Sequence, residues 1–152
     1  MLKHALCVGV LLLTANVALA DGESPVVTAD KVNWGPAPPV FPKGAQVGVL
    51  AGDPFKGGTF VLRLKMPDGY KLAAHNHPTT EYVTVISGKF HVGMGDDFDA
   101  KNTHEMSAGA FVVAPAKMSH YAFTTGETIV QVQGDGPFAM TYVNPSDDPS
   151  RQ

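Results

Sequence analysis

The sequence predicts a closed all-β fold, either a barrel or a double-sheet jelly roll. Three observations favour this fold class. The 152 residues include 16 glycines and 12 prolines, which suits many short strands joined by tight turns. From residue 45 onward, apolar residues recur with the two-residue period of strands in eight or more short runs. After residue 20 there is no convincing amphipathic helix of ten or more residues.

The first twenty residues have the pattern of a signal peptide. Lys3 and His4 form a short positive start, residues 5–13 are continuously apolar, and residues 18–20 have the small-x-small pattern of a cleavage site. An uncleaved membrane anchor is the alternative, but the apolar run is shorter than the ~20 residues that a spanning helix needs. We therefore predict cleavage after Ala20 and a periplasmic or secreted protein with no membrane attachment.

Composition excludes several kinds of site. Cys7 is the only cysteine and lies within the predicted signal peptide, so the mature chain would have no disulfide and no thiolate ligand. The net charge of -3 offers no basic surface for nucleic acid. A hydrophobic content of 44% and a charged content of 16% are ordinary for a globular chain and predict one domain with one core.

The mature chain divides into three parts. Residues 21–44 contain five prolines around Trp34, a composition that predicts an extended arm rather than a regular element. Residues 45–144 carry the strand pattern and form the predicted barrel domain. Residues 145–152 are polar, and we expect them to be a frayed tail.

Turn signals separate the predicted strands. The first two strands are residues 46–51 and 59–66, and four apolar residues share one face of the second: Phe60, Leu62, Leu64 and Met66. Further strands are expected at 70–77, 81–86, 89–95, 110–114, 120–124, 128–133 and 138–143, with turns at 67–69 and 87–88. The polar stretch 96–105 is interpreted as a solvated loop, because its acidic spacing does not fit the EF-hand pattern for calcium.

Residues that can bind a metal gather around the third predicted strand. His75 and His77 lie on the same face of that strand, about 7 Å apart at ~3.3 Å per residue. Glu81 opens the next strand after a Pro-Thr-Thr corner. Imidazole and carboxylate groups are common ligands of divalent transition metals, so this arrangement indicates a metal site.

Two segments of the chain resemble the two motifs of the cupin family. Five positions match the first motif and three match the second: Gly69, His75, His77, Glu81 and Gly88, then Gly109, Pro115 and His120. Lys117 stands where the second motif usually has glycine, and Thr124 where it usually has asparagine. A non-glycine residue at positive φ in the turn before His120 costs ~1 kcal/mol, but neither departure removes a ligand.

The resemblance implies a small jelly-roll barrel in which four side chains converge on one divalent ion: His75, His77, Glu81 and His120. Such a set suits iron, manganese, nickel, copper or zinc and leaves room for water or a small-molecule substrate. His91 and His104 are expected to be structural or exposed, because they fall out of phase with an apolar row and in the polar stretch, respectively. Gln131 and Gln133 share one face of a late strand, which either meets a substrate or faces solvent.

The sequence is compatible with two functions. The first is a metal-dependent oxygenase, isomerase or decarboxylase of a small organic molecule, although the sequence identifies no separate general acid or base. The alternative is a non-catalytic cupin that binds or senses a small ligand or a metal. No nucleophilic triad and no phosphate-binding glycine loop is present. The resemblance also suggests a homodimer.

Overall fold

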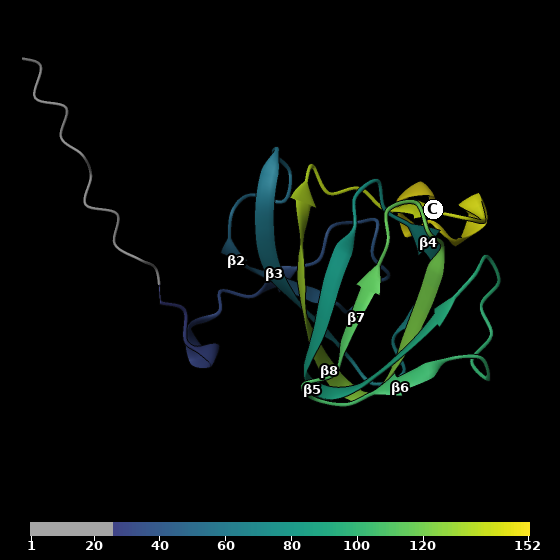
Figure 1. The fold of residues 1–152 in the computed structure, drawn as a ribbon, viewed down its shortest axis with the longest axis horizontal. Helices are drawn as coiled ribbons and strands as arrows, with labels where there is room; N and C mark the ends of the chain where they lie inside the picture. Colours follow the sequence, from purple (N-terminus) through teal and green to yellow (C-terminus); the bar gives the residue numbers. More distant parts are fainter. Residues whose placement is uncertain (1–25) are drawn as a thin grey trace, which may run out of the picture.

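The computed structural model describes residues 26–152, and the predicted signal peptide lies outside them. Figure 1 shows strands throughout, with only short 3-10 helices, so the all-β prediction is confirmed. The elements in chain order are η1 Ala29–Lys31, β1 Gly35–Pro36, β2 Gln46–Ala51, β3 Gly58–Met66, β4 Lys71–Asn76, β5 Glu81–Met94, β6 His104–Met106, β7 Phe111–Ala114, β8 His120–Gly136, β9 Thr141–Tyr142, η2 Pro145–Asp147 and η3 Pro149–Arg151. None of the helices in residues 26–152 has the length and apolar character to cross a membrane.

One antiparallel sheet folds back on itself through its two longest strands, β5 and β8. Residues 128–136 of β8 pair with β3, and the neighbouring part of β5 pairs with β7. The other ends of β8 and β5 pair with β4 and β6. Figure 1 accordingly shows β2 and β3 on the left, β4 and β6 on the right, and β5, β7 and β8 between them. The two halves enclose the core in the manner of a jelly roll.

The sequence prediction divided β5 and β8 into two strands each, and in this respect it is wrong. Residues 87–88 lie inside β5, where the register with β8 shifts twice. Gly88 has a φ of 79°, and a Cβ at this position would collide with the carbonyl oxygen of Glu127. The glycine therefore belongs to a bulge that bends a continuous strand. A bulge glycine and a turn glycine look alike in sequence.

The two faces of β3 differ in burial as the alternation of its residues predicts. Phe60, Leu62, Leu64 and Met66 of β3 are all buried. The intervening Arg63 and Lys65 lie on the outer face and are half-buried. The prediction that β3 has one apolar and one polar face is therefore confirmed.

The proline-rich arm is held against the sheet by side chains from its far edge. β1, which lies in this arm, pairs with β2. The hydroxyl of Tyr142 in β9 donates to the Val40 carbonyl at 2.9 Å, and the Tyr70 hydroxyl donates to the Pro42 carbonyl at 2.6 Å. The Phe41 ring stacks on Phe138 with centroids 5.9 Å apart. The arm thus closes the gap between the β2 and β9 ends of the sheet.

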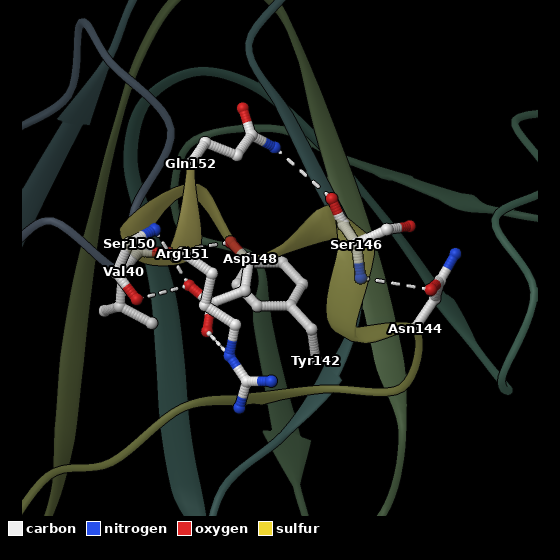
Figure 2. Close-up of polar contacts among 8 residues, drawn as sticks. All are labelled: Val40, Tyr142, Asn144, Ser146, Asp148, Ser150, Arg151 and Gln152. Carbon is white, nitrogen blue, oxygen red and sulfur yellow. Dashed lines mark hydrogen bonds and ion pairs between the residues drawn. The ribbon is translucent and has the colours of Figure 1, made fainter.

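The C-terminal residues are ordered into η2 and η3, so the prediction of a frayed tail is wrong. Figure 2 shows how local side chains organise this segment. The Asn144 side chain accepts from the Ser146 amide at 3.1 Å, and the Asp148 side chain accepts from the Ser150 amide at 2.9 Å. Asparagine and aspartate favour such turns because their side chains satisfy backbone N–H groups two residues on.

Two smaller elements also differ from the prediction. The polar stretch 96–105 ends in β6, whose His104 and Glu105 pair with β5. The expected strand at 138–143 is reduced to the two residues of β9. In both places the strand depends on a partner distant in sequence rather than on a local apolar pattern.

Candidate metal centre

The three predicted histidine ligands come together at one end of the folded sheet. His75 lies on β4 and is the register partner of His120, the first residue of β8. His77 follows β4 directly, and Glu81 opens β5. All four side chains are buried, with 3% to 7% of their surface exposed. Strand pairing therefore brings together residues that two separate sequence segments supply.

The histidine rings are close enough to share one ion. Their centroids are 4.4 Å apart for His75 and His120, 5.0 Å for His75 and His77, and 5.2 Å for His77 and His120. One ring nitrogen from each histidine lies within 4.8 Å of those of the other two. Metal–nitrogen bonds of about 2.0–2.1 Å allow such atoms to surround a single cation.

Backbone carbonyls fix the orientation of all three rings. The Nδ1 of His75 lies 2.7 Å from the Ala73 carbonyl, that of His77 2.8 Å from the Ala139 carbonyl, and that of His120 3.1 Å from the Met118 carbonyl. A carbonyl only accepts, so each Nδ1 carries the proton and donates. The Nε2 lone pairs are left free to bind a metal, which is the tautomer that second-shell partners commonly impose.

Burial keeps these imidazoles neutral. Burial first, and then the neighbouring His120 and His77, lower the pKa of His75 to about 3. Burial lowers the pKa of His77 to about 4, and it lowers the pKa of His120 as well. Neutral imidazole is the form that ligates, so the cluster is ready to bind a cation at neutral pH without first losing protons.

Glu81 lies beside the cluster rather than within the group of three. Its Oε2 is 3.3 Å from the Nε2 of His77. Burial raises the pKa of Glu81 to about 8, which favours the protonated carboxyl at neutral pH. To serve as a ligand, Glu81 would have to lose this proton.

The two departures from the second motif have clear structural roles. Lys117 has a φ of 64°, the only positive φ of a non-glycine residue within residues 26–152, and its amide donates to the His77 carbonyl at 2.8 Å. Thr124 is buried; its hydroxyl donates to the Pro67 carbonyl at 2.7 Å and accepts from the Tyr70 amide at 2.9 Å. Thr124 therefore joins β8 to the turn before β4.

The histidine cluster opens into an apolar cavity of about 200 Å³. The cavity lies between the two halves of the sheet, and the arm contributes Pro36, Pro38 and Phe41 to its wall. Within residues 26–152, the only polar side chains that line it are the three histidines and Glu81. A molecule in this cavity could therefore make polar contacts with side chains only at the histidines and Glu81.

The other polar candidates lie outside the cavity. Gln131 accepts a hydrogen bond from Arg63 Nε at 3.3 Å on the outer face of the sheet, so the solvent-facing interpretation holds for it. His91 stacks on Phe123 with centroids 4.2 Å apart and contacts the Thr125 hydroxyl, and His104 is exposed on β6. Neither histidine joins the cluster.

A protein-family model described as "Domain of unknown function (DUF4437)" matches residues 16–141. The chain belongs to this family. Comparison with curated proteins found no match.

Solved structures similar to this chain have the cupin fold. The polyketide cyclase RemF from Streptomyces resistomycificus matches with a TM-score of 0.68 at 17% identity, over 85% of this chain and 92% of that one. An RmlC-like cupin from Shewanella frigidimarina matches with a TM-score of 0.56 at 16% identity, over 72% and 87%. Salicylate 1,2-dioxygenase from Pseudoaminobacter salicylatoxidans matches with a TM-score of 0.54 at 14% identity, over 64% and 29%. The resemblance to cupins is confirmed, and so is the jelly-roll fold it implies.

Sequence reasoning missed the residues that support the cluster from the C-terminal segment. Phe138 packs on the His77 ring with centroids 5.4 Å apart, and the next carbonyl, that of Ala139, orients the same ring. Tyr142 packs near His75 at 5.9 Å. The apolar pattern of residues 138–143 predicts a strand but carries no sign that this segment contacts the histidine cluster.

Proposed function

We propose that this protein holds one divalent transition-metal ion at His75, His77 and His120, with Glu81 as a fourth ligand, and that it oxygenates a small organic molecule in the adjoining cavity. The observation that carries the proposal is the shared orientation of the histidines: each Nδ1 is tied to a carbonyl, which leaves each Nε2 lone pair to bind a metal, beside an apolar cavity.

The donor set suits a first-row metal. Three neutral imidazoles favour iron, manganese, nickel, copper or zinc, and the mixed nitrogen and oxygen set with Glu81 does not distinguish among them. Within residues 26–152, only these four polar side chains line the site, so coordination positions stay open to other molecules. Such an ion, when bound, supplies Lewis acidity and, if it is redox-active, electron transfer.

The cavity favours an oxygenase over an isomerase or a decarboxylase. Reactions that move protons usually need a positioned general acid or base within reach of the substrate. Within residues 26–152 the cavity wall has no titratable side chain apart from the proposed ligands. The cupin fold accommodates both a dioxygenase and a cyclase among the similar structures. The role of this chain's residues is then to hold the ion, exclude water and orient the substrate.

A non-catalytic binding protein is the second candidate, and the same lack of proton-transfer groups favours it. In that case the metal centre would bind the polar end of a ligand without turnover. We also propose, from the first twenty residues and the cupin resemblance respectively, that the protein is exported to the periplasm or beyond and forms a homodimer.

Elemental analysis of protein purified without an affinity tag or chelator tests the metal site. We expect about one equivalent of a first-row metal in the wild type and in His104→Ala, and none in the double variant His75→Ala/His120→Ala. Absence of metal from the wild type, even after incubation with each ion, would refute the site. Oxygen uptake by the reconstituted protein with candidate substrates then separates the oxygenase from the binding protein.

A further inference from the structure

The cavity wall away from the metal centre is uniformly apolar. Within residues 26–152, it consists of aliphatic, aromatic, proline and methionine side chains. Its inner rows come from neighbouring strands β3, β8 and β5, and they include Leu62, Val132 and Val83.

Polar residues are present on the same strands, but they face outward. Arg63 and Gln131 are register partners on β3 and β8, and they bond to each other on the outer surface. Gln133 occupies the next outward position of β8 and is exposed. The alternation along these strands therefore directs Arg63, Gln131 and Gln133 away from the cavity.

A wall of this kind restricts what can bind. A hydroxyl or amide placed against it would lose its bonds to water and find no partner, and a charged group would lose far more. Only the end of the cavity at the histidines and Glu81 offers polar contacts. A ligand must therefore have its polar atoms at one end and an apolar body behind them.

The size of the cavity sets a second limit. Its volume is about 200 Å³. Apolar protein cavities of about 150 Å³ bind benzene. A molecule with one ring, or a branched chain of similar volume, fits this space, whereas sugars and nucleotides are excluded by polarity as well as by size.

We infer that the substrate is a compact molecule of about one ring in size, with a polar head that meets the metal centre and an uncharged, apolar body that fills the cavity. The inference rests on the proposed function for the position of the head. The preference for an apolar body follows from the wall alone and does not depend on a metal.

The probes are 4-methylphenol and hydroquinone, which differ only in a methyl or a hydroxyl at the end remote from the first hydroxyl. Both are titrated by calorimetry, under nitrogen, into the metal-free protein and into the zinc-loaded protein, because zinc is redox-inert. We expect 4-methylphenol to bind at least about tenfold more tightly than hydroquinone in both forms, since the second hydroxyl of hydroquinone lies unpaired against the wall. We expect zinc to tighten the binding of both.

A matched pair of variants tests whether the inner wall of the cavity produces the preference for 4-methylphenol. Val132→Thr adds a hydroxyl to the inner wall without changing its shape, and Val61→Thr makes the same change on the outer face of β3, opposite Gln133. We expect Val132→Thr to narrow the preference for 4-methylphenol by at least about threefold and Val61→Thr to leave it unchanged. If Val132→Thr fails to fold in a thermal melt, Val83→Thr, its cross-strand neighbour, replaces it.

The outcomes separate this inference from the proposed function. Equal binding of the two phenols to the wild type, or no binding of either, overturns the inference. An equal effect of Val61→Thr and Val132→Thr overturns it as well. A methyl preference in both forms, with zinc leaving the affinity of both phenols unchanged, supports the apolar body and overturns the placement of the head at the metal, and with it the metal-dependent function.

Discussion

The five histidines within residues 26–152 form two groups that differ in burial, in neighbours and in hydrogen bonding. His75, His77 and His120 are buried, lie within 5.2 Å of one another by ring centroids, and each has its Nδ1 tied to a carbonyl. His91 and His104 lie on the outside of β5 and β6, where one stacks on an aromatic ring and the other is exposed. Burial, neighbours and a fixed tautomer, rather than the imidazole itself, distinguish a metal site.

The largest change in metal affinity should come from removing the side chain of a buried histidine. His77→Ala should weaken zinc affinity by more than about hundredfold, because loss of a second-shell partner alone costs 10–100-fold and His77 is a direct ligand in the proposed site. His104→Ala, the matched exposed position, should leave affinity unchanged. Competition titration with a metal-binding dye measures both, and similar losses in the two variants would refute the distinction between the groups.

The pH dependence of metal binding tests Glu81. The histidine pKa values are depressed, to about 3 for His75 and about 4 for His77, so these residues release no proton on binding at pH 7. The Glu81 pKa is raised to about 8, so Glu81 must release one proton if it ligates. Affinity should then rise about tenfold per pH unit between pH 6 and 8 and level off above the pKa of Glu81.

Calorimetry in buffers with different ionisation enthalpies counts the released protons directly. Glu81→Gln should bind metal without proton release and with an affinity that is flat over the same pH range. If the wild type also releases no proton at pH 7, Glu81 is not a ligand, and the site consists of the three histidines alone.

The difference between the two groups of histidines was partly readable from the sequence. The spacing of His75 and His77 in a strand, with the second motif around His120, identified the buried group, because strand alternation is a local property. The residues that orient and pack against the buried histidines could not be predicted from the sequence. Ala139, Phe138 and the arm residue Phe41 reach the site through pairing between distant segments, which no local pattern encodes.

A buried and an exposed tyrosine differ in the same way as the two groups of histidines, and their substitution should have a smaller effect, on the free energy of unfolding. Tyr142 is buried and donates to the Val40 carbonyl of the arm, whereas Tyr82 is 44% exposed on the outer face of β5. Tyr142→Phe should lower the free energy of unfolding by about 1 kcal/mol, the usual contribution of one hydrogen bond, and Tyr82→Phe should not change it. Urea unfolding monitored by circular dichroism measures the free energy of unfolding of both variants. Equal free energies would show that the hydrogen bond from Tyr142 to Val40 does not stabilise the protein.

The smallest effect should come from a lysine whose backbone, rather than its side chain, matters to the site. Lys117 is exposed, yet it holds a φ of 64° and its amide donates to the His77 carbonyl. Glycine adopts this conformation without the Cβ clash, so Lys117→Gly should raise the free energy of unfolding by up to about 1 kcal/mol while leaving metal affinity unchanged. Lys101→Gly, in an exposed turn with no positive φ, should give no such gain. A loss of stability in Lys117→Gly would mean that the lysine side chain contributes more than the strain of its backbone costs.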